Sequence, residues 1–288
     1  MYTIDPDLRI GSVSLAVSDL ARSVDFYQGV LGLPLISREG AGASLGPDAA
    51  HPSLTLSEIA HPTPLRPDAT GLFHVAWLHP SRAELAASVQ RIAAARWLIG
   101  GASDHGVSEA LYLTDPDGLG IEIYADRPRS RWERPADGDG VRMVTLQLDL
   151  DDLLAQAPAA PADEVARGVR VGHVHMKVSD VARAVEFYRG TLGFEEQARM
   201  PSAAFLSAGG YHHHLGLNSW QSAGAPAPPD SAPGLRDVRF ELGGRGALAE
   251  LERALGAQAA PTDGGGVSVR DPDGQLLTFA ADADGDGA

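Results

Sequence analysis

Residues 11–33 read GSVSLAVSDLARSVDFYQGVLGL, and residues 172–194 read GHVHMKVSDVARAVEFYRGTLGF. The two segments share Val-Ser-Asp, an Ala-Arg pair, a Phe-Tyr pair and a closing Leu-Gly. In each segment an alternating apolar run precedes Ser-Asp, a good helix N-cap, and apolar residues then recur at helical spacing. Each segment therefore predicts a strand, a cap and a helix, and the repeat predicts a fold made of copies of one unit.

A second element is also duplicated along the chain. Each copy predicts a short strand, a helix and an Asp-Pro-Asp-Gly turn in front of one last strand; Pro presets φ and Gly supplies the positive φ that such a hairpin needs. The strands are 71–77 and 234–240, the helices 82–95 and 246–255, and the turns 115–118 and 271–274. The chain therefore reads as four βαβββ modules, which begin near residues 9, 70, 170 and 233.

The composition changes between the second and third modules. A charged, turn-rich stretch is followed by a short predicted strand with a turn of helix, and then by a Pro/Ala connector. We therefore expect modules 1 and 2 in residues 1–130, a linker in 131–168, and modules 3 and 4 in 169–288.

Composition restricts the partners of the protein. The 288 residues carry a formal net charge of −15, which argues against a nucleic-acid backbone or an anionic membrane as the main partner. No stretch approaches about 18 uninterrupted apolar residues, and the first residues lack the pattern of a signal peptide, so we expect a cytoplasmic protein. Because the chain has no cysteine, any metal must be held by His, Asp or Glu, and ten histidines are present.

The repeats resemble the vicinal-oxygen-chelate superfamily, which includes glyoxalase I, bleomycin-resistance proteins and type I extradiol dioxygenases. The resemblance covers nearly the whole chain. Residues 108–130, SEALYLTDPDGLGIEIYADRPRS, and residues 207–218, SAGGYHHHLGLN, look like the bacterial catechol-2,3-dioxygenase group in particular. The resemblance implies an α+β fold in which pairs of modules form two cupped mixed sheets with outer helices and a metal at the floor of a cup.

In this superfamily the metal ligands lie on the first and last strands of the modules. Extradiol enzymes use one His from the first strand of one module, with one His and one Glu from its partner. The resemblance thus implies that His74, Glu122 and His173 hold Fe(II), with Mn(II) as an alternative, and leave positions for a diol and dioxygen. Modules 1 and 4 offer Ser12, Asp237 and Thr278 at the matching positions, which is a poor metal site.

The proposed ligand set has a consequence for topology. His173 lies in module 3 and the other two residues in module 2, so we expect the site between modules 2 and 3, with module 1 paired to module 4. A histidine on a strand is more often a half-buried packing residue than a ligand. Glu122 is harder to explain by packing, because an ionised carboxylate in an apolar strand is costly unless it is paired or bound to metal.

The same resemblance implies three catalytic residues. Neighbours on a strand point to opposite faces, so His213 cannot share a face with His212 and His214, and the apolar run that follows gives His213 the acid–base role. His212 and His214 are compatible with a solvated strand end.

Tyr112, ten residues before Glu122, lies where extradiol enzymes have a tyrosine whose hydroxyl contacts the substrate. His105 resembles the additional active-site histidine of those enzymes. Tyr112 is also compatible with core packing, and His105 with an exposed loop.

Other conspicuous residues read as structural. His51, His61 and His79 lie next to prolines and look like surface residues, whereas His175 fits either packing or the surroundings of the metal. The four tryptophans read as core or linker packing: Trp77, Trp97, Trp132 and Trp220.

The function implied by the resemblance is ring cleavage of catechol or a substituted catechol by dioxygen. Two alternatives remain: a glyoxalase-like metal-dependent lyase or isomerase, and a metal-free protein that binds an aromatic drug. The ring substituents and the oligomeric state, including a homo-oligomer, stay open.

Overall fold

The computed structural model describes residues 2–135, 140–159 and 163–282, and it contains the four βαβββ modules that the repeats predict. Module 1 comprises β1 (Arg9–Val17), α1 (Leu20–Gly29), β2 (Leu35–Glu39), β3 (Gly42–Leu45) and β4 (Leu54–Glu58). Module 2 comprises β5 (Gly71–His79), α2 (Arg82–Ala94), β6 (Gly101–Asp104), β7 (Ser108–Thr114) and β8 (Gly120–Asp126).

The second half repeats this order. Module 3 comprises β9 (Arg170–Lys177), α4 (Val181–Val185), its π-helical continuation η2 (Glu186–Thr191), β10 (Glu195–Met200), β11 (Ala203–Ser207) and β12 (Leu215–Asn218). Module 4 comprises β13 (Gly234–Leu242), α5 (Arg245–Leu255), the 3-10 turn η3 (Gly256–Gln258), β14 (Ala260–Pro261), β15 (Val267–Arg270) and β16 (Leu276–Ala281).

The strands form two eight-stranded mixed sheets. One has the order β14-β15-β16-β13-β1-β4-β3-β2 and the other the order β10-β11-β12-β9-β5-β8-β7-β6. The first strands of two modules thus pair antiparallel at the centre of each sheet, β1 with β13 and β5 with β9. Module 1 shares a sheet with module 4, and module 2 shares one with module 3. The predicted α+β class and the cupped mixed sheets are confirmed.

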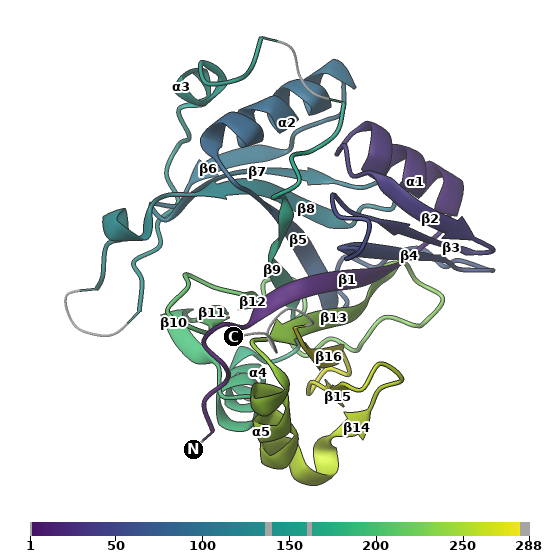
Figure 1. Cartoon of the computed structure of the whole chain (residues 1–288), viewed down its shortest axis with the longest axis vertical. Coiled ribbons are helices and arrows are strands. Elements are labelled where there is room, and N and C mark those ends of the chain that lie inside the picture. Colours follow the sequence, from purple (N-terminus) through teal and green to yellow (C-terminus); the bar gives the residue numbers. More distant parts are fainter. Residues whose placement is uncertain (1, 136–139, 160–162, 283–288) are drawn as a thin grey trace.

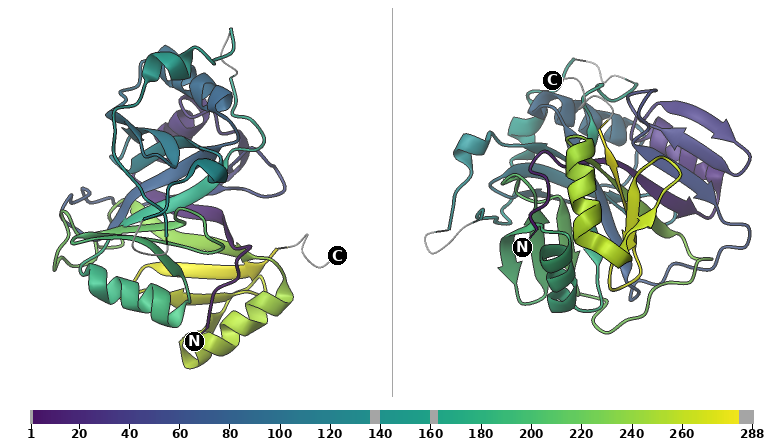
Figure 2. Two further views of the ribbon diagram at one scale, coloured as in Figure 1. Left: turned by 90° about the vertical axis from the view of Figure 1, so that its left-hand side faces the viewer. Right: turned by 60° about the horizontal axis from the view of Figure 1, so that its bottom comes forward.

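The helices lie outside the strands. In Figure 1, α1 and α2 lie toward one end of the molecule and α4 and α5 toward the other, with β1, β5, β9 and β13 between them. The left view in Figure 2 shows the same separation. Along β5, Val75 and Trp77 belong to the main apolar core, whereas Ala76 packs with Tyr124 in a small cluster on the other face of the sheet. That other face carries the site.

The repeated motifs make the same contact in both halves. Asp19 and Asp180 cap α1 and α4, as the Ser-Asp pattern predicts. The serine before each cap is bound by the second Asp of an Asp-Pro-Asp-Gly turn: the Ser18 N–H donates to Asp117 at 2.8 Å, and the Ser179 N–H donates to Asp273 at 2.8 Å. These bonds join module 1 to module 2 and module 3 to module 4, whereas the sheets join the modules in the other combination.

Between modules 2 and 3 lie the 3-10 turn η1 (Arg129–Arg131) and the short helix α3 (Leu150–Leu154). Of the short strand and turn of helix expected in residues 141–154, the helix is present as α3, and in place of the strand the structure has a single antiparallel bridge between Leu146 and Asp104. Within the described ranges, no helix has the length and apolar character needed to cross a membrane.

Candidate metal centre

Three adjacent strands bring the proposed ligands together. On β5, Ala76 pairs with Glu122 of β8 on one side and with His173 of β9 on the other. Residues that pair directly in a ladder point to the same face, and His74 reaches that face from two positions earlier on β5. Ala76, between Glu122 and His173, carries only a methyl group and so leaves room for the three longer side chains to converge.

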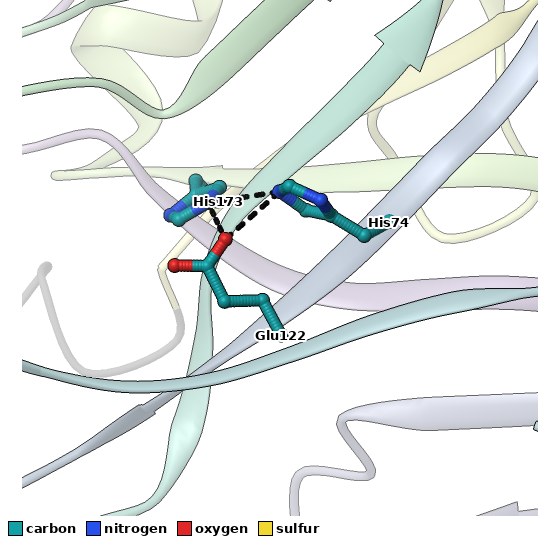
Figure 3. A group of neighbouring side chains, drawn as sticks. All are labelled: His74, Glu122 and His173. Carbon is teal, nitrogen blue, oxygen red and sulfur yellow. Dashed lines mark hydrogen bonds and ion pairs between the residues drawn. The ribbon is translucent and has the colours of Figure 1, made fainter. Parts of the chain in front are cut away.

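The three side chains converge on one point (Figure 3). The Nε2 atoms of His74 and His173 lie 3.0 and 3.2 Å from Glu122 Oε2, and 3.3 Å from each other. Bonds of about 2.1 Å that meet at right angles place neighbouring ligand atoms about 3.0 Å apart. The triangle therefore has the dimensions of one face of an octahedron, and this donor set fits a divalent first-row metal.

The electrostatics keep Glu122 and His173 in the forms that bind a metal. Burial alone would raise the pKa of Glu122, but its contacts with His173 and His74 hold it well below its usual range. Burial lowers the pKa of His173 from 6.5 to about 4, against the opposing effect of Glu122. A carboxylate at Glu122 and a neutral imidazole at His173 are therefore the stable forms at neutral pH, and a metal would displace little proton from these two residues.

The triad opens onto a cavity of about 460 Å³. Its lining is largely apolar and includes Phe73, Met143, Met200, Phe205 and Trp220. His105, Tyr112 and His213 also line this cavity, so the six residues singled out from the sequence meet at one place. Among the described residues that line it, none is Lys or Arg.

His105 and Tyr112 form a pair with a defined donor. His105 Nδ1 lies 2.7 Å from the Val144 carbonyl, which can only accept, so Nδ1 carries the hydrogen of the neutral ring. His105 Nε2, 2.6 Å from the Tyr112 hydroxyl, must then accept from the phenol. Burial, together with the nearby Glu122, raises the pKa of Tyr112, so its hydroxyl keeps the proton that it donates.

His213 reaches the cavity from an irregular segment rather than from the strand expected for the His212–His214 triplet. Gly209 and Gly210 have φ values of 59° and 65°, which turn the chain there, and β12 begins only at Leu215. The centroids of the His213 and His173 rings are 4.0 Å apart. Burial, and then His173 and His212, lowers the pKa of His213 well below its usual range, so this ring is neutral at neutral pH.

Several expectations about individual residues are wrong. His212 and His214 are buried, not solvated. His79 is also buried, because β5 continues to this residue before Pro80 ends it, and its Nε2 lies 2.8 Å from Ser88 Oγ on α2. Trp220 lines the cavity and is 52% exposed at its mouth instead of packing in a core or linker.

Other residues in or near the cavity are missing from the sequence-based set. Phe73 and Phe205 line the cavity, and their aromatic side chains next to predicted site strands are the only signal for them. Asp126, which contacts His212, could have been found from the alternation of β8, since Glu122, Tyr124 and Asp126 occupy every second position.

The sheet contains a position symmetric to Glu122, and it carries no ligand. Ala76 of β5 corresponds to His175 of β9, and the partner of His175 on β12 is Gly216. A Cβ on Gly216 would lie 2.7 Å from the His175 ring, so that ring occupies the space of a side chain here. Within the described residues, the donor set at this centre stops at three: His74, Glu122 and His173.

Comparison with known proteins agrees with the fold. The model of the Glyoxalase/Bleomycin resistance protein/Dioxygenase superfamily matches residues 9–123 and 170–279. The catechol-2,3-dioxygenase of Bacillus subtilis (strain 168) is 42% identical over 239 residues, which are 82% of this chain and 83% of that protein.

Two solved structures share the architecture at low sequence identity. A putative dioxygenase from Bacillus subtilis aligns with a TM-score of 0.66 at 15% identity, over 99% of this chain and 87% of its own. Glyoxalase I from Zea mays aligns with a TM-score of 0.54 at 16% identity, over 95% and 92%. The repeats, the two mixed sheets and the family match lead to one conclusion: the chain belongs to the glyoxalase/bleomycin resistance protein/dioxygenase superfamily.

Proposed function

We propose that the protein is an extradiol dioxygenase that holds Fe(II) at His74, Glu122 and His173 and opens the ring of catechol or a substituted catechol. The observation that carries the proposal is a three-ligand face at the floor of an apolar cavity that also contains His213, Tyr112 and His105. The name of the 42% identical relative supports the same reaction. Mn(II) is compatible with the same donor set.

When bound, the metal would supply Lewis acidity toward the diol and electron transfer between the diol and dioxygen. The chain itself would supply proton transfer. A catechol must lose protons from its oxygens and regain one during ring opening, and a neutral His213 beside the ligand His173 is a base at the right place. Both atoms of dioxygen enter the product, a hydroxymuconic semialdehyde, so catechol and dioxygen balance it without another reductant.

Tyr112 and His105 would orient the substrate. The Tyr112 hydroxyl donates its one hydrogen to His105 Nε2 at 2.6 Å, which holds the phenol in place and leaves its oxygen to accept from a diol hydroxyl. The apolar walls, which include Phe73 and Phe205, would enclose the ring and exclude water.

The lining also limits the substituents of the ring. A carboxylate buried in this cavity would meet no Lys or Arg among the described lining residues. An unpaired buried charge costs on the order of several kcal/mol. The apolar mouth at Trp220 and Met200 favours an uncharged, apolar substituent.

The two alternatives fit less well. A glyoxalase-like site would call for a fourth protein ligand, and Gly216 occupies the symmetric position. A metal-free binding protein leaves unexplained why Glu122, 3% exposed, lies against two histidine nitrogens.

The test is anaerobic reconstitution with Fe(II), followed by metal analysis and oxygen-electrode measurements with catechol and alkylcatechols. We expect one iron per chain and one dioxygen consumed per catechol. Full metal occupancy with no oxygen uptake on any catechol would contradict the proposed reaction, and a protein that binds neither Fe(II) nor Mn(II) would favour the metal-free alternative.

A further inference from the structure

His212 is a wholly buried polar side chain with a partner on each side. Its Nδ1 lies 2.8 Å from Nδ1 of His213, and its Nε2 lies 2.8 Å from Oδ1 of Asp126, the last residue of β8. The His212 side chain is 0% exposed, and it does not line the metal cavity, whereas the Asp126 side chain is 25% exposed. A line of contacts therefore runs from a partly solvated carboxylate to the ring beside the proposed metal ligands.

The carboxylate of Asp126, at the end of this line of contacts, determines which ring nitrogens carry the hydrogens. An ionised carboxylate can only accept, so His212 Nε2 carries the hydrogen. With a single ring hydrogen, placed on Nε2, His212 has a lone pair on Nδ1, and the contact at 2.8 Å then requires His213 Nδ1 to donate to it. In a neutral His213 the remaining ring nitrogen, Nε2, is left with the lone pair.

We propose that Asp126 and His212 are positioning residues that hold His213 in its Nδ1–H tautomer and present the unprotonated Nε2 to the substrate. The arrangement parallels a carboxylate that fixes the tautomer of a catalytic histidine, with one more imidazole inserted between the two. The role of the presented nitrogen rests on the proposed function, but the tautomer itself does not.

The site offers few other ways to fix this ring. The ring contacts of His213 are with His173, His212 and Phe205, and of these only His212 gives it a hydrogen bond among the described residues. Without that bond, packing would restrict the plane of the ring but would not choose which nitrogen carries the hydrogen. Asp126 in turn fixes the tautomer of His212, whose hydrogen could otherwise lie on either ring nitrogen.

The tautomer can be measured without catalysis. In the full chain with ¹⁵N-labelled histidine, loaded with diamagnetic Zn(II), long-range ¹H–¹⁵N correlation distinguishes the protonated ring nitrogen. We expect His213 to show Nδ1–H in the wild type and in the control Asp273→Asn, whose carboxylate binds Ser179 in another part of the fold. In His212→Phe and in Asp126→Ala we expect this tautomer to lose its predominance.

The kinetic arm uses the Fe(II)-loaded protein and catechol. We expect kcat of His212→Phe to fall by about 10–100-fold with little change in KM, as for other residues that orient an active-site group. His212→Asn keeps an oxygen acceptor near the place of Nδ1 and should recover part of the loss. Asp126→Ala serves as the second variant if His212→Phe fails to fold.

Three results separate the claims. An Nε2–H tautomer of His213 in the wild type, or the same tautomer in all variants, would overturn the proposal. A changed tautomer with unchanged kcat would overturn the catalytic role of the positioning. If the wild type turns over no catechol, the proposed function fails, while the Zn(II) spectra still decide whether Asp126 and His212 set the tautomer.

Discussion

The Nε2 atoms of His74 and His173 lie 3.3 Å apart, although 99 positions separate the two residues in the chain. They come from modules 2 and 3, whose first strands β5 and β9 pair antiparallel at the centre of one sheet. The candidate metal centre is therefore built across the linker between the halves of the chain. Each half alone contributes an incomplete set of ligands.

The first prediction concerns the carboxylate of the triad. Glu122→Gln keeps the size of the side chain but removes the charge that the metal requires. We expect the metal content to drop and ring cleavage to fall by more than about 100-fold. Metal analysis after dialysis, together with oxygen uptake, measures both.

A matched change separates metal loss from general destabilisation. Glu109 is also a buried glutamate, but it pairs with Arg82 and Arg127 outside the cavity. Glu109→Gln should lower the thermal midpoint while the folded protein keeps its metal. Equal metal content in both variants would contradict the role of Glu122.

The second prediction concerns the phenol of Tyr112. Tyr112→Phe removes the hydroxyl that lies 2.6 Å from His105 Nε2 and keeps the ring. If the hydroxyl oxygen accepts from a substrate hydroxyl, kcat should fall by about 100-fold or more while the metal content is unchanged. Steady-state kinetics on metal-saturated protein test this, and an unchanged kcat would mean that Tyr112 only packs.

The third prediction concerns the substrate. Because no Lys or Arg is among the described residues that line the cavity, carboxylated catechols should show kcat/KM values at least about 100-fold below those of methylcatechols. Comparable values for the two groups would show that a cation reaches the substrate from elsewhere.

The mouth of the cavity gives a variant of the same test. Trp220→Ala should raise KM for alkylcatechols by about tenfold, or ~1.4 kcal/mol, with a smaller effect on catechol itself. Leu98→Ala is a control at an apolar residue that is 81% exposed and lies outside the cavity lining. Equal effects on both substrates would remove Trp220 from substituent recognition.

The fourth prediction concerns pH and stability. Burial lowers the pKa of His79 from 6.5 to about 4. Between these values the unfolded chain binds more protons than the folded one, so the stabilisation is present above pH 6.5 and is lost as pH falls toward 4. The loss from this one residue is at most about 1.4 kcal/mol per pH unit.

His79→Leu tests this directly. The variant removes the titrating group, so the difference between the free energies of unfolding at pH 7 and pH 5 should shrink relative to the wild type. Urea unfolding at the two pH values measures it. A difference as large as that of the wild type would assign the acid sensitivity to other groups.

The modules could be predicted from sequence because each repeated motif performs the same local task twice. The bonds from Ser18 to Asp117 and from Ser179 to Asp273 explain why Ser-Asp and Asp-Pro-Asp-Gly recur together. The ligand candidates could be predicted because they lie at fixed positions on repeated strands. Their grouping in space followed only from the resemblance and from the pairing of modules that it required.

The surroundings of His213 could not be predicted in the same way. Alternation along a strand fails for His212 and His213, because the chain turns at Gly209 and Gly210 and the strand begins later. The contact between His212 and Asp126 spans 86 positions and joins two modules. Such a contact depends on how two segments meet in space, and neither segment shows it alone.

The most direct test of the central claim is the product formed from catechol and ¹⁸O₂ by the Fe(II)-loaded protein. The account predicts a yellow hydroxymuconic semialdehyde, cleaved next to the diol, with both labelled oxygen atoms in the product by mass spectrometry. Cleavage between the two hydroxyl-bearing carbons to a muconic acid, or recovery of unchanged catechol from protein with full metal occupancy, would contradict it.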